Sequence, residues 1–165
     1  MRWVDLFEGV EIPGLDAVTL DVVLDLLRNG PGDLRLVHHN QLLAYGDDGY
    51  DYRDEIADLK TELRSLIAGE KSLTLYRTVR HEPNLNACGI HWSIDPETGL
   101  EYGTWRIEAQ ANLDAVNWPE TIARGVMWWH QEREISLNRG ATIFIRSIHN
   151  EETGGIRRVG RAGTV

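Results

Sequence analysis

The sequence contains a single cysteine, Cys88, and lacks the features of several protein classes. One thiol cannot form a disulfide within the chain, which predicts a reducing compartment, the cytoplasm of a bacterium or of an infected host cell. No apolar run approaches the roughly 20 residues that cross a bilayer, so we expect no membrane segment. The stretch from Met1 to Pro13 carries three acidic residues and does not have the basic and then apolar pattern of a signal peptide.

Basic residues are also scarce, because 17 Lys and Arg stand against 26 Asp and Glu, for a net charge of −9. Proteins that bind nucleic acid usually carry a basic surface, so nucleic acid is disfavoured as a partner. The only basic cluster consists of Arg157, Arg158 and Arg161. We interpret it as part of a solvated tail that covers residues 151–165.

Patterns for metal binding and for nucleophilic catalysis are weak. The adjacent His38 and His39 point in different directions on either a strand or a helix. The nearby Asp47-Asp48-Gly49 is typical of a turn and does not fit a calcium loop. Cys88 lies in no recognisable nucleophile motif, and the chain has no glycine-rich phosphate-binding loop. We therefore expect no bound metal.

Apolar residues make up 42% of the chain, which is enough for a packed core. The first part has the spacing of helices. One apolar stripe runs from Leu20 to Leu27 and stops at Asn29-Gly30-Pro31. A second stripe runs from Ile56 to Ile67, and Gly69 lies just past its end.

The pattern changes at Ser72 to short runs of β-branched, aromatic and aliphatic residues with short loops between them. We predict strands at 73–79, 89–94, 104–111, 125–129, 134–137 and 141–148. This succession predicts an α+β fold, in which a helical N-terminal region (1–72) packs on a mixed or antiparallel β-rich core (73–150). The tail 151–165 follows.

Three short stretches of the β-rich part carry the residues best suited to chemistry. They are Leu75-Tyr76-Arg77, Gly89-Ile90-His91-Trp92-Ser93-Ile94-Asp95 and Gln131-Glu132-Arg133-Glu134-Ile135-Ser136-Leu137.

Arg77 follows Leu73 and Leu75 at a period of two, so it lies on their face of the strand. Its planar guanidinium matches a phosphate or a carboxylate, or it forms a buried ion pair.

Glu132 and Glu134 would share one face if they began a strand. Paired carboxylates suit the stabilisation of a positively charged sugar-like transition state, and a charged strand edge is the alternative. Ser93 and His91 lie on the face opposite Trp92. A serine there is able to orient a neighbouring carboxylate, and Trp92 either stacks on a planar ring or belongs to the core.

Together and in this order, these stretches resemble the Arg-Ser-Glu class of mono-ADP-ribosyltransferases, which are cholera-toxin-like and arginine-specific enzymes that include bacterial toxins, effectors and phage-encoded modifiers. Tyr76-Arg77, followed by the stretch from Gly89 to Asp95, is similar to the pattern YRG … G-x-[ST]-W-[ST]-x-D of small phage and bacterial members. The resemblance covers roughly Leu73 to Ile148. It implies an ADP-ribosyltransferase-like core that uses NAD as a substrate and a protein as the acceptor.

The resemblance also implies a role for each catalytic residue. Arg77 would hold the NAD phosphates and brace the pocket, and Ser93 would position the catalytic glutamate. Glu134 would bind the 2′-hydroxyl of the nicotinamide ribose and stabilise the oxocarbenium ion. Glu132 would orient or deprotonate the acceptor, and a glutamate at this position is typical of enzymes that modify arginine.

Three further residues would form the NAD pocket. Tyr76 and Trp92 would line the nicotinamide site, and the backbone of Thr78 would hold the nicotinamide amide. Members of the class often have glycine at the position of Thr78. Thr78 therefore leaves open a catalytically silent module that binds NAD or a partner, such as an inhibitory or structural phage protein. An NAD glycohydrolase also stays open, because water could replace the acceptor and Glu132 would serve either reaction.

Overall fold

The computed structural model describes residues 53–165. The helix expected at Leu20 to Leu27, the His38-His39 pair and the turn at Asp47 lie outside the described residues. The described part divides into two units. One, called the sheet unit here, consists of Lys71–Asn117 and His130–Val165, and the other includes the helical residues before Lys71 and Trp118–Trp129.

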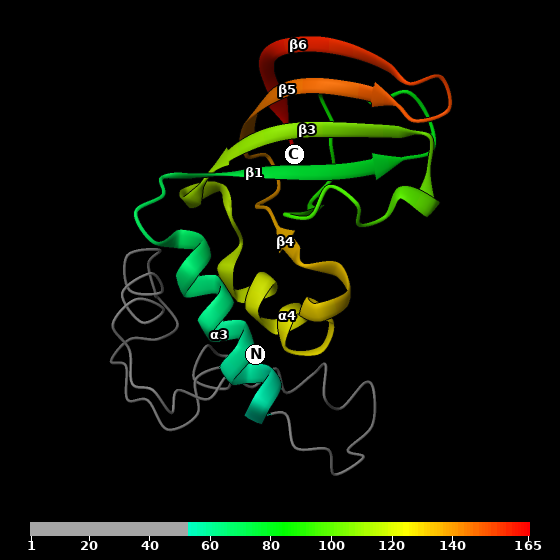
Figure 1. The fold of residues 1–165 in the computed structure, drawn as a ribbon. Helices are drawn as coiled ribbons and strands as arrows, with labels where there is room; N and C mark the ends of the chain where they lie inside the picture. Colours follow the sequence, from blue (N-terminus) through cyan, green and yellow to red (C-terminus); the bar gives the residue numbers. More distant parts are fainter. Residues whose placement is uncertain (1–52) are drawn as a thin grey trace. The chain divides into compact units, whose positions relative to one another are not determined.

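The sheet unit is built on six antiparallel strands in the order β4-β2-β1-β3-β5-β6. Figure 1 shows β1, β3, β5 and β6 lying side by side. Because they contain both helices and an antiparallel sheet, the described residues have an α+β fold. The strands are β1 (Ser72–Val79), β2 (His91–Ser93), β3 (Trp105–Asn112), β4 (Glu134–Ser136), β5 (Thr142–Asn150) and β6 (Gly155–Thr164). Two short 3-10 helices, η3 (Leu100–Tyr102) and η4 (Leu113–Ala115), follow β2 and β3 respectively.

Five of the predicted strands are confirmed, and their alternation explains the core of the sheet. In β3, Ile107, Ala109 and Ala111 are each at most 1% exposed, and in β1 the side chains of Leu73 and Leu75 are buried. Alternating apolar residues put one face of each strand into the core.

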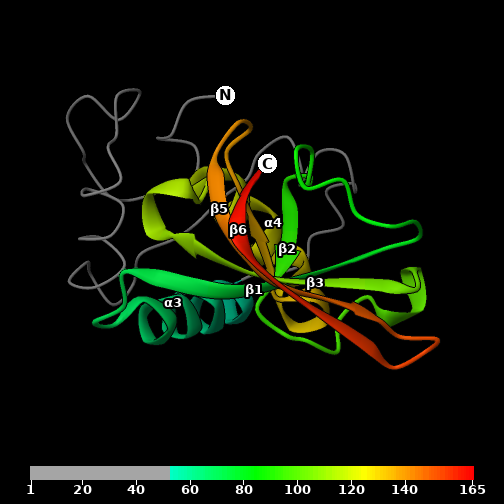
Figure 2. The ribbon, with the colours of Figure 1, turned by 90° about the horizontal axis from the view of Figure 1, so that it is seen from above.

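The prediction that residues 151–165 form a solvated tail is wrong for the backbone of this segment. Residues Gly155–Thr164 form β6, which pairs with β5 from Thr142↔Thr164 to Asn150↔Gly155. Figure 2 shows β5 and β6 running together as one long hairpin. The side chains of Arg157, Arg158 and Arg161 are exposed on this edge strand, so the polar composition that suggested a tail reflects the exposure of the strand.

The other unit contains α3 (Arg53–Ile67), which confirms the second predicted helix. Its Leu59, Leu63 and Ile67 are fully buried at helical spacing. The strand predicted at 125–129 is wrong, because this run belongs to α4 (Trp118–Glu132). A Cβ on Gly125 would lie 2.8 Å from Leu59 Cδ1, so the glycine lets the two helices approach closely, and the indole of Trp129 donates a hydrogen bond to Glu62.

No helix among the described residues is both long and apolar enough to cross a membrane.

Candidate active site

The residues selected from the sequence converge on one hollow of the sheet unit, with a volume of about 160 Å³. They come from β1, from β2 and from the junction between α4 and β4. The hollow is lined by Tyr76, Arg77, Thr78, Trp92, Ser93, Glu132 and Glu134, together with His91, Thr98, Gly99 and Tyr102.

The register of the sheet brings three of these residues into one row. Tyr76 of β1 pairs with Ser93 of β2, and Ser93 pairs with Glu134 of β4. Directly opposed residues on antiparallel strands have their side chains on the same face. In the described sheet β1 and β2 pair at Tyr76 and Ser93 alone, so the two strands separate beyond that point, next to Arg77.

The Arg77 side chain fills this separation. Its Nη1 donates a hydrogen bond of 2.5 Å to the carbonyl of His91, and its Nε is buried without a hydrogen-bond partner. Burial lowers the pKa of the guanidinium, while Cys88 and Glu134 oppose that shift. An arginine stays charged in spite of such a shift, so the hollow holds a fixed cation with an unsatisfied donor close to the Glu134 carboxylate.

Gly89 provides the surface against which the guanidinium lies. Its φ is +82°, and a Cβ there would lie 2.7 Å from Nη2 of Arg77. The carbonyl of Gly89 accepts a hydrogen bond of 2.9 Å from the Trp92 indole. Trp92 is only 2% exposed, so its interpretation as a core residue is supported, and it offers almost no surface on which a ring could stack.

The Ser93 hydroxyl contacts the backbone close to Glu134 and forms no hydrogen bond with the Glu134 carboxylate. Its hydroxyl donates to the carbonyl of Glu132 at 2.7 Å and accepts from the backbone N–H of Asp95 at 3.0 Å. The hydroxyl therefore fixes the α4–β4 junction against the end of β2. The side-chain contact expected from the resemblance is replaced by this backbone contact.

Glu132 and Glu134 do not share a strand, so the condition under which their side chains would lie on one strand face is not met. Glu132 is the last residue of α4, Arg133 has a φ of 43°, and Glu134 is the first residue of β4. The left-handed turn at Arg133 nevertheless brings both glutamates to the same hollow. The side chain of Glu134 is 14% exposed, and its Oε1 lies 2.8 Å from Nδ1 of His91.

Sequence reasoning did not select His91, Thr98, Gly99 or Tyr102, which line this hollow, or Gly89, which lies against Arg77. A signal for His91 was present, because the alternation of the strand put it on the face of Ser93. No comparable signal exists for Thr98 and Tyr102, which lie in the turn after β2 and at the end of η3.

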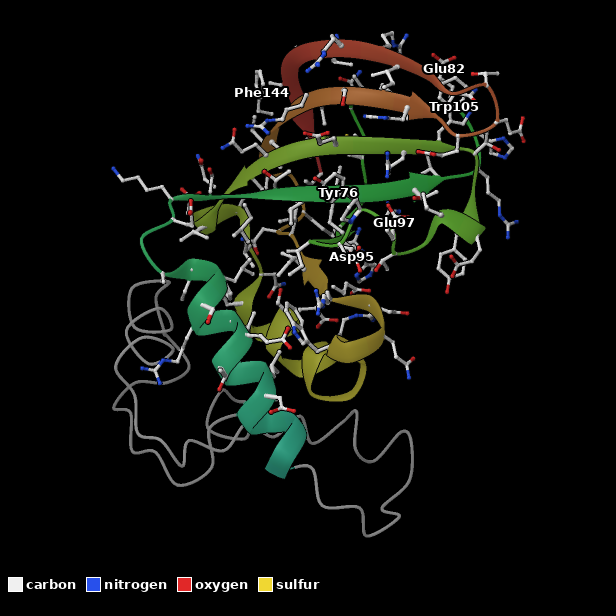
Figure 3. The ribbon with its side chains drawn as sticks, in the orientation of Figure 1. Tyr76, Glu82, Asp95, Glu97, Trp105 and Phe144 are labelled. Carbon is white, nitrogen blue, oxygen red and sulfur yellow. The ribbon has the colours of Figure 1, made fainter. Side chains whose placement is uncertain are left out.

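A second hollow of about 360 Å³ adjoins the first and shares Thr98, Gly99, Tyr102 and Glu132 with it. Its other lining residues are Asp95, Glu97, Glu101 and Gln131, so four carboxylates face it in all. Figure 3 labels Asp95 and Glu97 on the segment that follows β2. The Asp95 carboxylate accepts a hydrogen bond of 2.9 Å from the Glu97 N–H, which stabilises the turn that carries these acids.

The remaining reactive candidate, Cys88, is buried. Its Sγ lies 3.4 Å from the carbonyl of Leu85. Burial raises the pKa of the thiol, while a backbone hydrogen bond involving Thr164 and the charge of Arg77 lower it. Since the thiolate is the nucleophile, this environment does not favour catalysis by Cys88. Among the described residues, no group of three or more His, Cys, Asp or Glu side chains could hold a metal.

Comparisons with known proteins do not supply a family. No family model, curated protein or solved structure matches this chain. The function therefore has to be argued from the geometry of the two hollows and from the resemblance of the motifs.

Proposed function

We propose that this chain is a mono-ADP-ribosyltransferase, which cleaves NAD and transfers ADP-ribose to an arginine of a protein acceptor. One observation carries the proposal: all seven residues selected from three separate stretches of the sequence line a single hollow. The pairing of β1 with β2 and of β2 with β4 brings the three stretches together, and it puts the chemical types that the proposed reaction needs side by side.

The chemistry needs one anion, one cation and a position for the acceptor. The bond between the ribose C1′ and the nicotinamide nitrogen breaks, and its electron pair leaves with neutral nicotinamide, so no acid is required. Glu134 stabilises the positive charge that develops on the ribose, and Arg77 attracts the pyrophosphate. A guanidinium nitrogen of the acceptor then bonds to C1′, and its proton passes to Glu132.

The acidic second hollow supports arginine as the acceptor. Its carboxylates, Asp95, Glu97, Glu101 and Glu132, would repel a pyrophosphate and attract a guanidinium. Glu132 lines both hollows, so an acceptor held in the second hollow would approach the reacting ribose through this residue. The first hollow, at about 160 Å³, is smaller than the roughly 300 Å³ and more of common ligand pockets, so it would enclose only part of the NAD molecule.

The test is the release of nicotinamide from NAD, measured with and without agmatine, a small molecule that carries the guanidinium of arginine. We expect agmatine to raise the release and to become ADP-ribosylated. Glu134→Gln keeps the shape of the side chain and removes its charge, and we expect it to lower the rate by about a hundredfold to a thousandfold. Glu82→Gln is the matched control, because the Glu82 side chain is 62% exposed and lines neither hollow.

Other outcomes point to other functions. If the rate of nicotinamide release does not change with any acceptor and the release disappears in Glu134→Gln, the chain is an NAD glycohydrolase. NAD binding without release by the folded protein would identify a silent binding module. Absence of both binding and release would refute the proposal.

A further inference from the structure

His91 connects the two charged residues of the proposed site. Its ring Nδ1 lies 2.8 Å from Oε1 of Glu134, and its carbonyl accepts a hydrogen bond of 2.5 Å from Nη1 of Arg77. Its partner across β2 and β4 is Ser136, whose hydroxyl lies 3.5 Å from the same Oε1. In the related sequence pattern a serine or threonine occupies the position of His91, so this connection is a feature of this chain.

We propose that His91 is a positioning residue, which holds the Glu134 carboxylate in one orientation towards the ribose by donating a hydrogen bond from Nδ1. The inference rests on the proposed function, since it assigns a task to His91 in the same reaction. It adds a residue that neither the motifs nor the chemistry of NAD cleavage requires.

The physical reason is the freedom of a glutamate side chain. A glutamate has three side-chain torsions, and fixing them costs conformational entropy that a hydrogen bond offsets. A carboxylate that accepts a hydrogen bond from an imidazole forms a strong, directional contact, especially when one partner is charged. Arg77 bonds to the carbonyl of His91, which fixes the backbone that carries the imidazole. Displacement of a reacting group by about 1 Å can cost about a hundredfold in rate.

A purely structural ion pair would behave differently. The His91 side chain is 38% exposed and the Glu134 side chain is 14% exposed, so the pair is partly shielded from solvent and its loss should lower the urea midpoint modestly. For a purely structural pair this loss of stability would be the whole effect, and a variant that is still folded would keep its kcat. If the ring positions Glu134, the same change lowers kcat and leaves the KM for NAD almost constant, because the ring is expected to act on Glu134 and not on the bound substrate.

Three substitutions separate these cases. An asparagine amide nitrogen comes close to the position of Nδ1, whereas a glutamine amide nitrogen comes close to that of Nε2. We expect His91→Ala to lower kcat by about tenfold to a hundredfold, His91→Asn to restore most of the loss, and His91→Gln to restore little. Nicotinamide release at saturating NAD gives kcat, and urea unfolding checks that each variant is folded.

A spectroscopic measurement tests the contact without catalysis. At alkaline pH, the ring ¹⁵N shifts of His91 should show the proton on Nδ1, and Glu134→Ala should shift the proton towards Nε2. A proton on Nε2 in the unmodified chain would overturn the proposal. An unchanged kcat in His91→Ala, with active unmodified protein, would overturn it and leave the transferase intact. A complete lack of release by the unmodified protein would refute the transferase, and with it the role of His91.

Discussion

A single glycine, Gly89, determines where the guanidinium of Arg77 lies. Its backbone has a φ of +82°, and the open space above its Cα is filled by the arginine, with Nη2 only 2.7 Å from the position of a Cβ. The Arg77 side chain bonds to the His91 carbonyl from this position. The glycine and the arginine thus act as one structural feature, although eleven residues lie between Arg77 and Gly89 along the chain.

Substitution of this glycine should lower both activity and stability, and only the loss of activity should depend on Arg77. Gly89→Ala adds a methyl group that pushes the flexible guanidinium off the His91 carbonyl, and the left-handed backbone adds a cost of about 1–2 kcal/mol. We expect kcat/KM for NAD to fall by about tenfold or more, while the free energy of unfolding falls by a similar 1–2 kcal/mol. NAD titration with nicotinamide detection, and urea unfolding, measure the two quantities.

Gly140→Ala is the control for backbone strain. Gly140 has a φ of +77° and nothing within 4 Å of a Cβ, and it lines neither hollow. It should lose about the same stability and keep its activity. Equal losses of activity in the two variants would show that strain, and not displacement of Arg77, is responsible.

At the scale of elements, the sequence predicts regular strands well and misjudges segments whose apolar pattern is short or absent. The run 125–129 has no periodicity of its own, and such runs do not distinguish a strand from a helix. Its helical stripe becomes visible only from Trp118 onward, since Trp118, Thr121 and Trp129 are each at most 2% exposed at helical spacing. The proline that follows Trp118 is also typical of the first turn of a helix.

β6 was missed for a different reason, because most of its side chains are exposed. The end of β6 stabilises the sheet unit through backbone hydrogen bonds to two other segments of the chain. The N–H of Thr164 donates to the carbonyl of Leu85 at 2.9 Å, and its carbonyl accepts from the N–H of Cys88 at 2.8 Å. The N–H of Val165 donates to the carbonyl of Ala141 at 2.9 Å, and its carbonyl accepts from the N–H of Gly140 at 2.8 Å. The first pair anchors the loop that ends at Gly89.

Deletion of the last two residues, 164 and 165, tests this backbone contribution. It removes these four hydrogen bonds, and at about 0.5–1.5 kcal/mol each the free energy of unfolding should fall by about 2–6 kcal/mol. Urea denaturation followed by tryptophan fluorescence measures the loss. Thr164→Ala keeps the backbone and alters only an exposed side chain, so we expect it to be nearly neutral. A deletion as neutral as Thr164→Ala would refute a stabilising role for the end of β6.

At the scale of the whole molecule, the sequence selected the residues of the first hollow better than it described their contacts. The selection of Arg77, Ser93 and Glu134 follows from the order and the chemical types of three short stretches. Their contacts do not follow, because the left-handed turn at Arg133 and the backbone bond of Ser93 depend on the local conformation of residues 132–134. The face of His91 was visible in the alternation, but its contact with Glu134 required the register between β2 and β4.

The net charge of the whole molecule leads to a prediction about how activity depends on salt. The chain carries a net charge of −9, and carboxylates line the second hollow. Such a field attracts a cationic acceptor over long distances and repels NAD, whose net charge is negative. The field weakens as salt rises, because the screening length falls from about 30 Å at 0.01 M to about 8 Å at 0.15 M.

We therefore expect kcat/KM for agmatine to fall severalfold between about 0.01 and 0.5 M salt, while kcat/KM for NAD stays constant or rises. Initial rates of agmatine ADP-ribosylation, with each substrate varied in turn, separate the two responses. The double variant Glu97→Gln/Glu101→Gln distinguishes the local hollow from the overall charge, because it removes two of the carboxylates that line the hollow and leaves a large net negative charge. A flatter salt dependence for agmatine in this variant would assign acceptor attraction to the hollow. An unchanged dependence would assign it to the molecule as a whole, and an identical response of both substrates to salt would exclude electrostatic selection of a cationic acceptor.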